Sequence, residues 1–319
     1  MIRSVIVLCL GVVVACGDPA PPLDAHSTVP RTAVGTYTVE STFDVALPDA
    51  ARPLFSTLAE ATDGPDDPSR FVVDAMVARL PDGTIARVAS AAAPFVAAYL
   101  NTRLAEIAPR LAPGLAQLTA QLSRIAQHLE TVETFRIAAD GSMVRAVTGV
   151  RFAIGTGLAL PFAAVGLPEV AATAKVDLRS GRLHLGATQL ALPYAQLLRL
   201  GLDRAVVPTL DPHATDLAGA LRDLVDCARL GELVADEVGV GTTQMYATAC
   251  DAAMTAVAAR IDADLDAIGQ TPLHLDVAGT ATGYDLDGDL AMDAIHDGAW
   301  LGQPGSSFVV AAGTFTGVR

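Results

Sequence analysis

The amino-acid sequence predicts an α+β protein in which a mainly antiparallel, curved sheet packs against long α-helices. Apolar and polar residues alternate within the segments 37–47, 131–192 and 273–316, as they do in half-buried strands. The segments 51–130 and 194–268 instead place their apolar residues at helical spacing. Strands and helices therefore follow one another in blocks without regular alternation, which favours an antiparallel sheet.

The N-terminus has the composition of an export signal. Arg3 precedes an apolar run from Val5 to Val14, and the small residue Ala15 precedes Cys16. The run Val13-Val14-Ala15-Cys16 resembles the cleavage motif of bacterial lipoprotein signal peptides. In that class the cysteine takes a diacylglyceryl group and becomes the mature N-terminus. An apolar run of roughly ten residues is too short for a membrane-spanning helix, which needs about twenty, so a lipid anchor fits better.

The resemblance implies an exported lipoprotein of the cell envelope, with a signal peptide at residues 1–15 and palmitate on Cys16. In enterobacterial lipoproteins an aspartate directly after the cysteine retains the protein at the inner membrane. Here Gly17 holds that place and Asp18 follows. We therefore expect an anchor in the outer membrane, with the folded part in the periplasm or on the envelope.

Residues 16–33 are expected to be the lipidated cysteine and a flexible tether, and residues 34–319 a single α+β domain. The tether is rich in proline and poor in bulky apolar residues, a composition of extended, unpacked chain. A subdivision of the domain near the helical block 193–270 remains an alternative.

The composition restricts the partners of the chain. Its hydrophobic fraction is 51% but its aromatic fraction only 5%, so alanine, leucine and valine fill most of the core. The net charge is -14, and Lys175 is the single lysine. Such an acidic chain would repel nucleic acid, which excludes nucleic acid as a partner.

Two predicted helices differ from the others in how their apolar and charged residues are distributed. One has a leucine-rich seam with steps of four and three, formed by Leu111, Leu115, Leu118, Leu122, Ile125 and Leu129. The other, from Ile85 to Leu100, carries only Arg87 as a charge, and we expect it to be buried nearly all round.

Turn signals at Asp140-Gly141 and Ser180-Gly181 predict two hairpins within the strand block. The segment 152–168 between them carries no charge and is interrupted by glycine and proline. We interpret it as a buried strand pair or loop. The alternative is the wall of an apolar cavity or a loop that dips into a membrane.

Cys227 and Cys250 are the two cysteines that remain beyond Cys16. In an exported protein such a pair predicts one disulfide, here between consecutive helical segments. A metal pair or a catalytic thiol is the alternative, but neither has a companion motif.

An acidic loop is the one candidate metal site. Asp285, Asp287 and Asp289 alternate around Gly288, and Asp293 follows, so their oxygens could converge on Ca²⁺. This looks like the start of an EF-hand loop. It departs from that pattern because Leu290 replaces the glycine and His296 replaces the final glutamate. The alternative is an acidic turn that binds no metal, in which case the protein has no cofactor.

Catalytic motifs are missing from the sequence. No Gly-x-Ser-x-Gly elbow is present, and Gly305-Ser306-Ser307 lacks the flanking residues of one. The histidines show no zinc-binding spacing, and no glycine-rich loop carries the lysine of a phosphate site. We therefore assign no catalytic residue.

The function that these observations favour is that of a non-enzymatic, lipid-anchored envelope protein whose domain binds or shelters an apolar ligand such as a lipid. Phe95, Tyr99, Phe152 and Phe162 are the candidate residues of its apolar wall. A long helix on a curved antiparallel sheet leaves an apolar seam, as in tubular lipid-binding domains. The alternatives are a structural or adhesion module with a weak Ca²⁺ site, and a hydrolase with a non-standard site.

Overall fold

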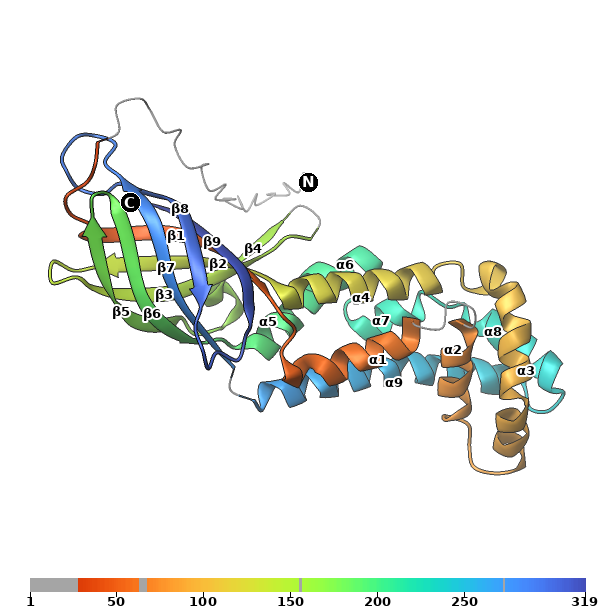
Figure 1. Cartoon of the computed structure of the whole chain (residues 1–319). Helices are drawn as coiled ribbons and strands as arrows, with labels where there is room; N and C mark the ends of the chain where they lie inside the picture. The colour runs from red at the N-terminus through yellow and green to blue at the C-terminus, as the bar shows by residue number, and fades with distance from the viewer. Residues whose placement is uncertain (1–27, 63–67, 155–156, 272) are drawn as a thin grey trace, which may run out of the picture.

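The computed structural model describes residues 28–62, 68–154, 157–271 and 273–319. The predicted signal peptide and the lipidated Cys16 lie outside the described residues. The molecule is elongated, with a β-barrel at one end and a bundle of helices at the other (Figure 1).

The strands have the following bounds: β1 (Gly35–Val45), β2 (His128–Ile137), β3 (Ser142–Phe152), β4 (Leu158–Pro161), β5 (Val170–Arg179), β6 (Arg182–Ala191), β7 (His274–Tyr284), β8 (Ala294–Gly302) and β9 (Val310–Val318). Eight of them follow one another around the barrel in the order β2-β1-β9-β8-β7-β6-β5-β3, and the pairing of β2 with β3 closes the ring. Strand β4 pairs only with the end of β3, beside the ring. All these pairings are antiparallel.

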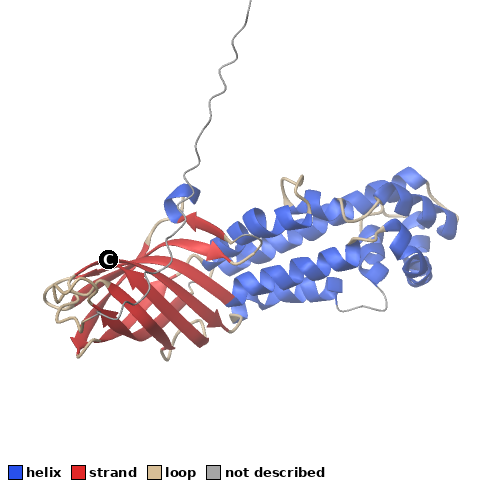
Figure 2. Ribbon diagram, turned by 90° about the horizontal axis from the view of Figure 1, so that it is seen from above, coloured by secondary structure: helices blue, strands red, loops and turns tan. Residues whose placement is uncertain are grey.

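The helices form two blocks, each inserted between consecutive strands at the same end of the barrel (Figures 1 and 2). Between β1 and β2 lie α1 (Arg52–Thr62), α2 (Pro68–Val77), α3 (Thr84–Ile107) and α4 (Leu111–Gln127). Between β6 and β7 lie α5 (Tyr194–Gly201), a π-helical turn (Leu202–Val206), α6 (Val207–Leu210), α7 (Leu217–Arg222), α8 (Cys227–Val238) and α9 (Thr243–Gly269). Short 3-10 turns precede α1 (Asp49–Ala51) and follow β4 (Phe162–Val165).

The predicted fold class, a curved open sheet against long helices, is wrong because the sheet closes on itself. The alternation of apolar and polar residues reports which face of a strand is buried, but it carries no information on which strand is the neighbour. Closure removes the exposed sheet edges. The helices therefore extend from the end of the barrel instead of covering one face of a sheet (Figure 2).

The local predictions within the barrel are confirmed. The turns at Asp140-Gly141 and Ser180-Gly181 connect β2 with β3 and β5 with β6. In β1 the alternate residues Tyr37, Val39 and Phe43 are fully buried inside the barrel.

A buried ion pair occupies the barrel interior. The Arg145 side chain on β3 donates through Nε and Nη2 to the two carboxylate oxygens of Glu133 on β2, at 2.6 and 2.8 Å, and both side chains are fully buried. Arg145 also donates to the Thr188 hydroxyl at 2.9 Å. Its guanidinium carbon lies 4.1 Å from the centre of the Trp300 ring and 5.7 Å from that of Phe43. These contacts satisfy the charges that burial would otherwise penalise.

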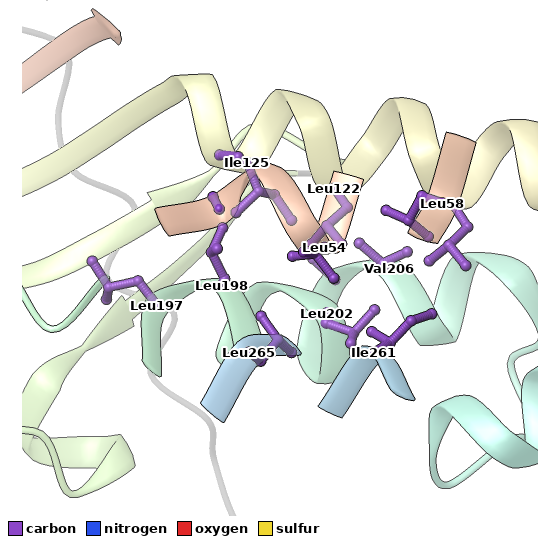
Figure 3. Close-up of a cluster of buried hydrophobic side chains, with 14 of the residues drawn as sticks. Leu54, Leu58, Leu122, Ile125, Leu197, Leu198, Leu202, Val206, Ile261 and Leu265 are labelled. Atoms are coloured by element: carbon purple, nitrogen blue, oxygen red, sulfur yellow. The ribbon is translucent and has the colours of Figure 1, made fainter. Parts of the chain in front are cut away.

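The helical bundle has a core of aliphatic side chains (Figure 3). Helix α4 supplies most of the predicted leucine seam, since all its members from Leu111 to Ile125 are buried, whereas Leu129 belongs to β2. The side chains that meet there are Leu54 and Leu58 of α1, Leu122 and Ile125 of α4, Leu197 and Leu198 of α5, Leu202 and Val206 of the π-helical turn after it, and Ile261 and Leu265 of α9.

The prediction that the helix from Ile85 to Leu100 is buried nearly all round is wrong. Helix α3 packs against α2 and α8 through one face only. Phe95, at 74% exposure, lies on the other face. Low charge in the sequence therefore marks an apolar helix but does not determine whether the protein itself covers it.

Among the described helices, none is both long enough and apolar enough to cross a membrane.

The ion pair generates a stability prediction. Arg145→Leu leaves the Glu133 carboxylate buried without its partner, so we expect the free energy of unfolding to fall by about 3–5 kcal/mol in urea denaturation. The double variant Glu133→Leu/Arg145→Leu removes both charges and should lose less. Arg151→Leu is the matched control, because the Arg151–Glu40 pair is half exposed and should contribute about 1 kcal/mol or less. Equal losses for Arg145→Leu and Arg151→Leu would contradict the interpretation.

Candidate functional site

The barrel wall parts between β5 and β6. These strands pair over only four residue pairs, from Val176 with Leu185 to Arg179 with Arg182 next to their connecting turn. From Lys175 back to Val170, β5 pairs with β3 alone. We call the resulting opening, at the barrel end that faces the helices, the β5–β6 cleft.

A β-bulge in β6 lies where its pairing with β5 ends. Leu185 pairs with Gly279 and Thr188 with Val277, so β6 has an extra residue against β7 at this point, and a bulge bends its strand. Gly186 lies in the bulge, where a Cβ atom would stand only 3.1 Å from the backbone oxygen of Lys175. A glycine inside an alternating strand is the sequence signal that indicates such a bulge.

The inner face of β5 is incompletely covered. Ala172 lies directly opposite the buried Arg145, so it faces the barrel interior. The inner-facing residues of β5 are nevertheless only half-buried, namely Val170, Ala172, Ala174, Val176 and Leu178. Inner-facing residues of β6 and β7, such as Leu183 and Leu275, are fully buried. The cleft therefore exposes apolar surface that a closed wall would cover.

At the helical end the cleft widens into a hollow of about 240 Å³. Its described lining comes from β5, β6, α5, α9 and the adjoining loops: Pro168, Val170, Ala191, Leu192, Pro193, Tyr194, Ala195, Gln196, Ile268, Gly269, Thr271 and Leu273. None of these is an acid, a base or a histidine. In so acidic a chain, an uncharged lining favours an apolar ligand.

Tyr194 is held as a neutral side chain in the lining. Its hydroxyl donates to the Ala126 backbone oxygen at 2.7 Å, and its ring contacts Phe308 edge to face with 5.1 Å between ring centres. Burial raises the pKa of the Tyr194 hydroxyl. The ring is thus fixed by partners within the protein.

The four predicted residues of an apolar wall do not come together. Phe152 at the end of β3 and Phe162 after β4 are buried near the barrel end of the core. Phe95 and Tyr99 lie on α3, at the opposite end of the helical bundle (Figure 1). The charge-free segment 152–168 nevertheless contributes Pro168 to the hollow, and sequence reasoning missed Val170, Leu192 and Tyr194.

The acidic loop joins β7 to β8 at the other end of the barrel. Ligand atoms of Asp285, Asp287 and Asp289 lie within 4.8 Å of one another. Asp293 has a different role, because its carboxylate accepts the backbone N–H of Leu286 at 2.8 Å. The geometry therefore groups three of the four predicted metal ligands.

Hydrogen bonds already engage these carboxylates. Asp285 is fully buried and accepts the backbone N–H groups of Gly288 and Leu290 at 2.7 and 3.0 Å. It also accepts the hydroxyl of Thr28, in a segment that runs along this loop. The Thr28 hydroxyl, followed by the two backbone groups, holds the pKa of Asp285 below its usual range against the opposing effect of burial.

Two serines of the loop between β8 and β9 contact His274, the first residue of β7, without forming a catalytic pair. The Ser306 hydroxyl donates to the His274 backbone oxygen at 3.0 Å, and the Ser307 hydroxyl accepts the His274 backbone N–H at 3.1 Å. In the described part of the chain, no serine hydroxyl bonds to a histidine ring. These contacts fix the loop before β9, and the hydrolase alternative gains no support.

The disulfide between Cys227 and Cys250 is present and joins α8 to α9. A polar hollow of about 580 Å³ lies beside it. Two of the aspartates that line it, Asp216 and Asp226, accept backbone N–H groups at the starts of α7 and α8. Helix capping therefore accounts for these two carboxylates.

No protein-family model, curated protein or solved structure matches the chain.

The Thr28–Asp285 contact generates a pH prediction. A carboxylate with a lowered pKa stabilises the fold above its usual pKa of about 4, and this stabilisation is lost as the pH falls through the lowered value. Thr28→Val removes the hydroxyl and should raise the pKa of Asp285. We expect a lower Tm at neutral pH and a difference from the wild type that shrinks in acid, as measured by circular dichroism.

Thr32→Val is the matched control, because the Thr32 hydroxyl accepts the backbone N–H of Val34 at 3.2 Å. A Tm difference for Thr28→Val that is the same at neutral and acid pH would contradict the role of Asp285.

Proposed function

We propose that this protein is a non-enzymatic, lipid-anchored lipoprotein of the bacterial cell envelope that holds an apolar chain in the β5–β6 cleft. The observation that carries the proposal is the opening of the barrel wall into a hollow whose described lining is uncharged. The lipoprotein-like motif ending at Cys16 supports the anchor and the envelope location, with the outer membrane as the expected site.

The size of the hollow indicates what kind of ligand fits. Pockets that enclose a whole drug-sized molecule measure roughly 300–1,000 Å³, whereas this one measures about 240 Å³. It therefore suits the end of an acyl chain, with the rest of the ligand along the half-buried inner face of β5. Each buried methylene would contribute about 0.8 kcal/mol.

The barrel centre is a poor alternative for the same ligand. Glu133, Arg145 and Trp300 occupy it, with the charges paired. An apolar chain there would separate the Arg145 guanidinium from the Glu133 carboxylate. Separating these buried charges costs several kcal/mol. The ligand is therefore expected at the helical end of the barrel.

The test is native mass spectrometry of the mature chain from Gly17, exported to a bacterial periplasm by a cleavable signal without a lipid-attachment cysteine, followed by extraction of bound lipid. We expect a copurifying acyl lipid in a defined ratio to protein. Val170→Trp fills the hollow and should abolish it. Ala171→Trp, one residue away on the exposed outer face of β5, is the matched control and should retain it.

Thermal unfolding verifies that both variants fold. A lipid-free wild type, or equal lipid retention by the two variants, would reject the cleft as the binding site.

A second candidate function, a structural or adhesion module with bound Ca²⁺, is favoured by the grouping of Asp285, Asp287 and Asp289. It predicts that millimolar Ca²⁺ raises the Tm and that EDTA reverses the change. Asp287→Asn should abolish the effect, whereas Asp177→Asn on β5 should preserve it. A Tm that is insensitive to Ca²⁺ would leave the loop as an acidic turn.

A further inference from the structure

The β5–β6 cleft leaves two strand edges without a neighbour, although closure removes such edges elsewhere in the ring. Strand β5 pairs with β3 along residues 170–175, but it pairs with β6 only from Val176 onward. Strand β6 likewise pairs with β5 only as far as Leu185, and with β7 alone along residues 188–191. Each open edge is about as long as an ordinary strand of five or six residues. Such edges present backbone N–H and C=O groups to the cleft.

The backbone groups of β5 that face the cleft can be identified. Val176 donates its N–H to the Gly141 backbone oxygen at 2.8 Å, on the side of β3. The direction of these groups alternates along an antiparallel strand, and the pairing of β3 with β5 has no bulge. The N–H and C=O groups of Ala171 and Thr173 therefore point away from β3 and into the cleft.

The two open edges lack the residues that protect free strands. Natural sheets discourage the addition of a further strand with charged side chains, prolines and bulges at their edges. Here Lys175 and the bulge at Gly186 lie where the open edges begin. Beyond them, residues 170–174 read Val-Ala-Ala-Thr-Ala and residues 187–191 read Ala-Thr-Gln-Leu-Ala, without a charge or a proline. Both edges are thus suited to pairing with another extended chain.

The small side chains of β5 leave room for such a chain. Ala172 and Ala174 face inward and are only half-buried, whereas Leu190, an inward residue of β6, is buried. An added strand could therefore direct larger apolar side chains inward at alternate positions and polar ones outward.

The chemistry of the edges matches a polypeptide better than a phospholipid. Alternating donors and acceptors are satisfied by the backbone of an extended peptide, as in the addition of a peptide strand to a sheet. A phospholipid offers ester and phosphate oxygens but no N–H groups at that spacing. The described lining of the hollow also contains no lysine or arginine for a phosphate.

The protein's own N-terminal segment does not suit the cleft. Residues 17–27 contain Pro19, Pro21 and Pro22, and a proline has no N–H to donate. The described part of the chain also begins at Thr28, beside the acidic loop at the other end of the barrel. The occupant is therefore expected to be a separate polypeptide.

We infer that the ligand of the cleft is an acylated peptide, whose acyl chain enters the hollow and whose first residues extend between β5 and β6. This inference rests on the proposed function and names its ligand class. Val170 at the start of β5 lines the hollow. A peptide that begins there runs parallel to β5 and antiparallel to β6.

The test is isothermal titration calorimetry with the mature chain from Gly17. The probes are decanamide, decanoyl-Thr-Val-Thr-Val-Thr amide, the same peptide with an acetyl group, and the decanoyl peptide with N-methylated valines. We expect the decanoyl peptide to bind about tenfold or more tightly than decanamide, because several backbone hydrogen bonds form together. N-methylation removes donors and should lower the affinity to about that of decanamide.

Thr173→Pro tests the edge of β5 from the side of the protein. It removes an N–H that points into the cleft, where proline is tolerated on an edge strand. We expect weaker binding of the decanoyl peptide and unchanged binding of decanamide. Thr173→Val is the matched control, because the side chain is exposed and valine keeps the N–H. Circular dichroism verifies that both variants fold, and the methylated peptide provides the same test without a change in the protein.

Equal affinities for the decanoyl peptide and its methylated analogue would overturn the inference but leave the proposed function intact if decanamide binds. Loss of both decanamide and peptide binding would reject both. An acetyl peptide that binds as tightly as the decanoyl peptide would assign the cleft to unmodified peptides instead. A dimer in analytical ultracentrifugation that Thr173→Pro dissociates would assign the edges to a second copy of the chain, and would also overturn the inference.

Discussion

The buried ion pair of Glu133 and Arg145 is the constraint on which the arrangement of the barrel depends. A guanidinium and a carboxylate can remain inside a protein only if each is paired and hydrogen-bonded, and the surroundings must keep that geometry. Strands β2 and β3, which carry the two groups, also close the barrel. The same contacts that satisfy the charges therefore hold the closing strands in register, with Trp300 stacked on the guanidinium.

This polar centre determines where an apolar molecule can be accommodated. Paired charges and aromatic rings occupy the middle of the barrel, so the hollow that we propose for an apolar ligand lies at the end where the pairing of β5 with β6 stops. The helices meet the barrel at that end, and α5 and α9 contribute to the lining of the hollow. A site at the junction of two structural parts is a common place for ligand binding.

The two ends of the molecule differ in chemistry. The end of the barrel away from the helices has the acidic loop, held to the segment after Thr28 by Asp285. The far end of the helical bundle has helix α3, on which Phe95 is exposed.

The sequence by itself determined the local features of this protein. Alternation identified β1 and both hairpins, helical spacing identified α4, and the two cysteines were correctly paired, because each feature depends on residues that are close along the chain or few in number. Closure of the barrel, the exposure of Phe95 and the separation of β5 from β6 were decided only by the tertiary structure. Periodicity records that a face is apolar, but which strand or helix covers it depends on long-range pairing. Here residues 170–175 of β5 pair with β3 but not with β6, beside a bulge at Gly186.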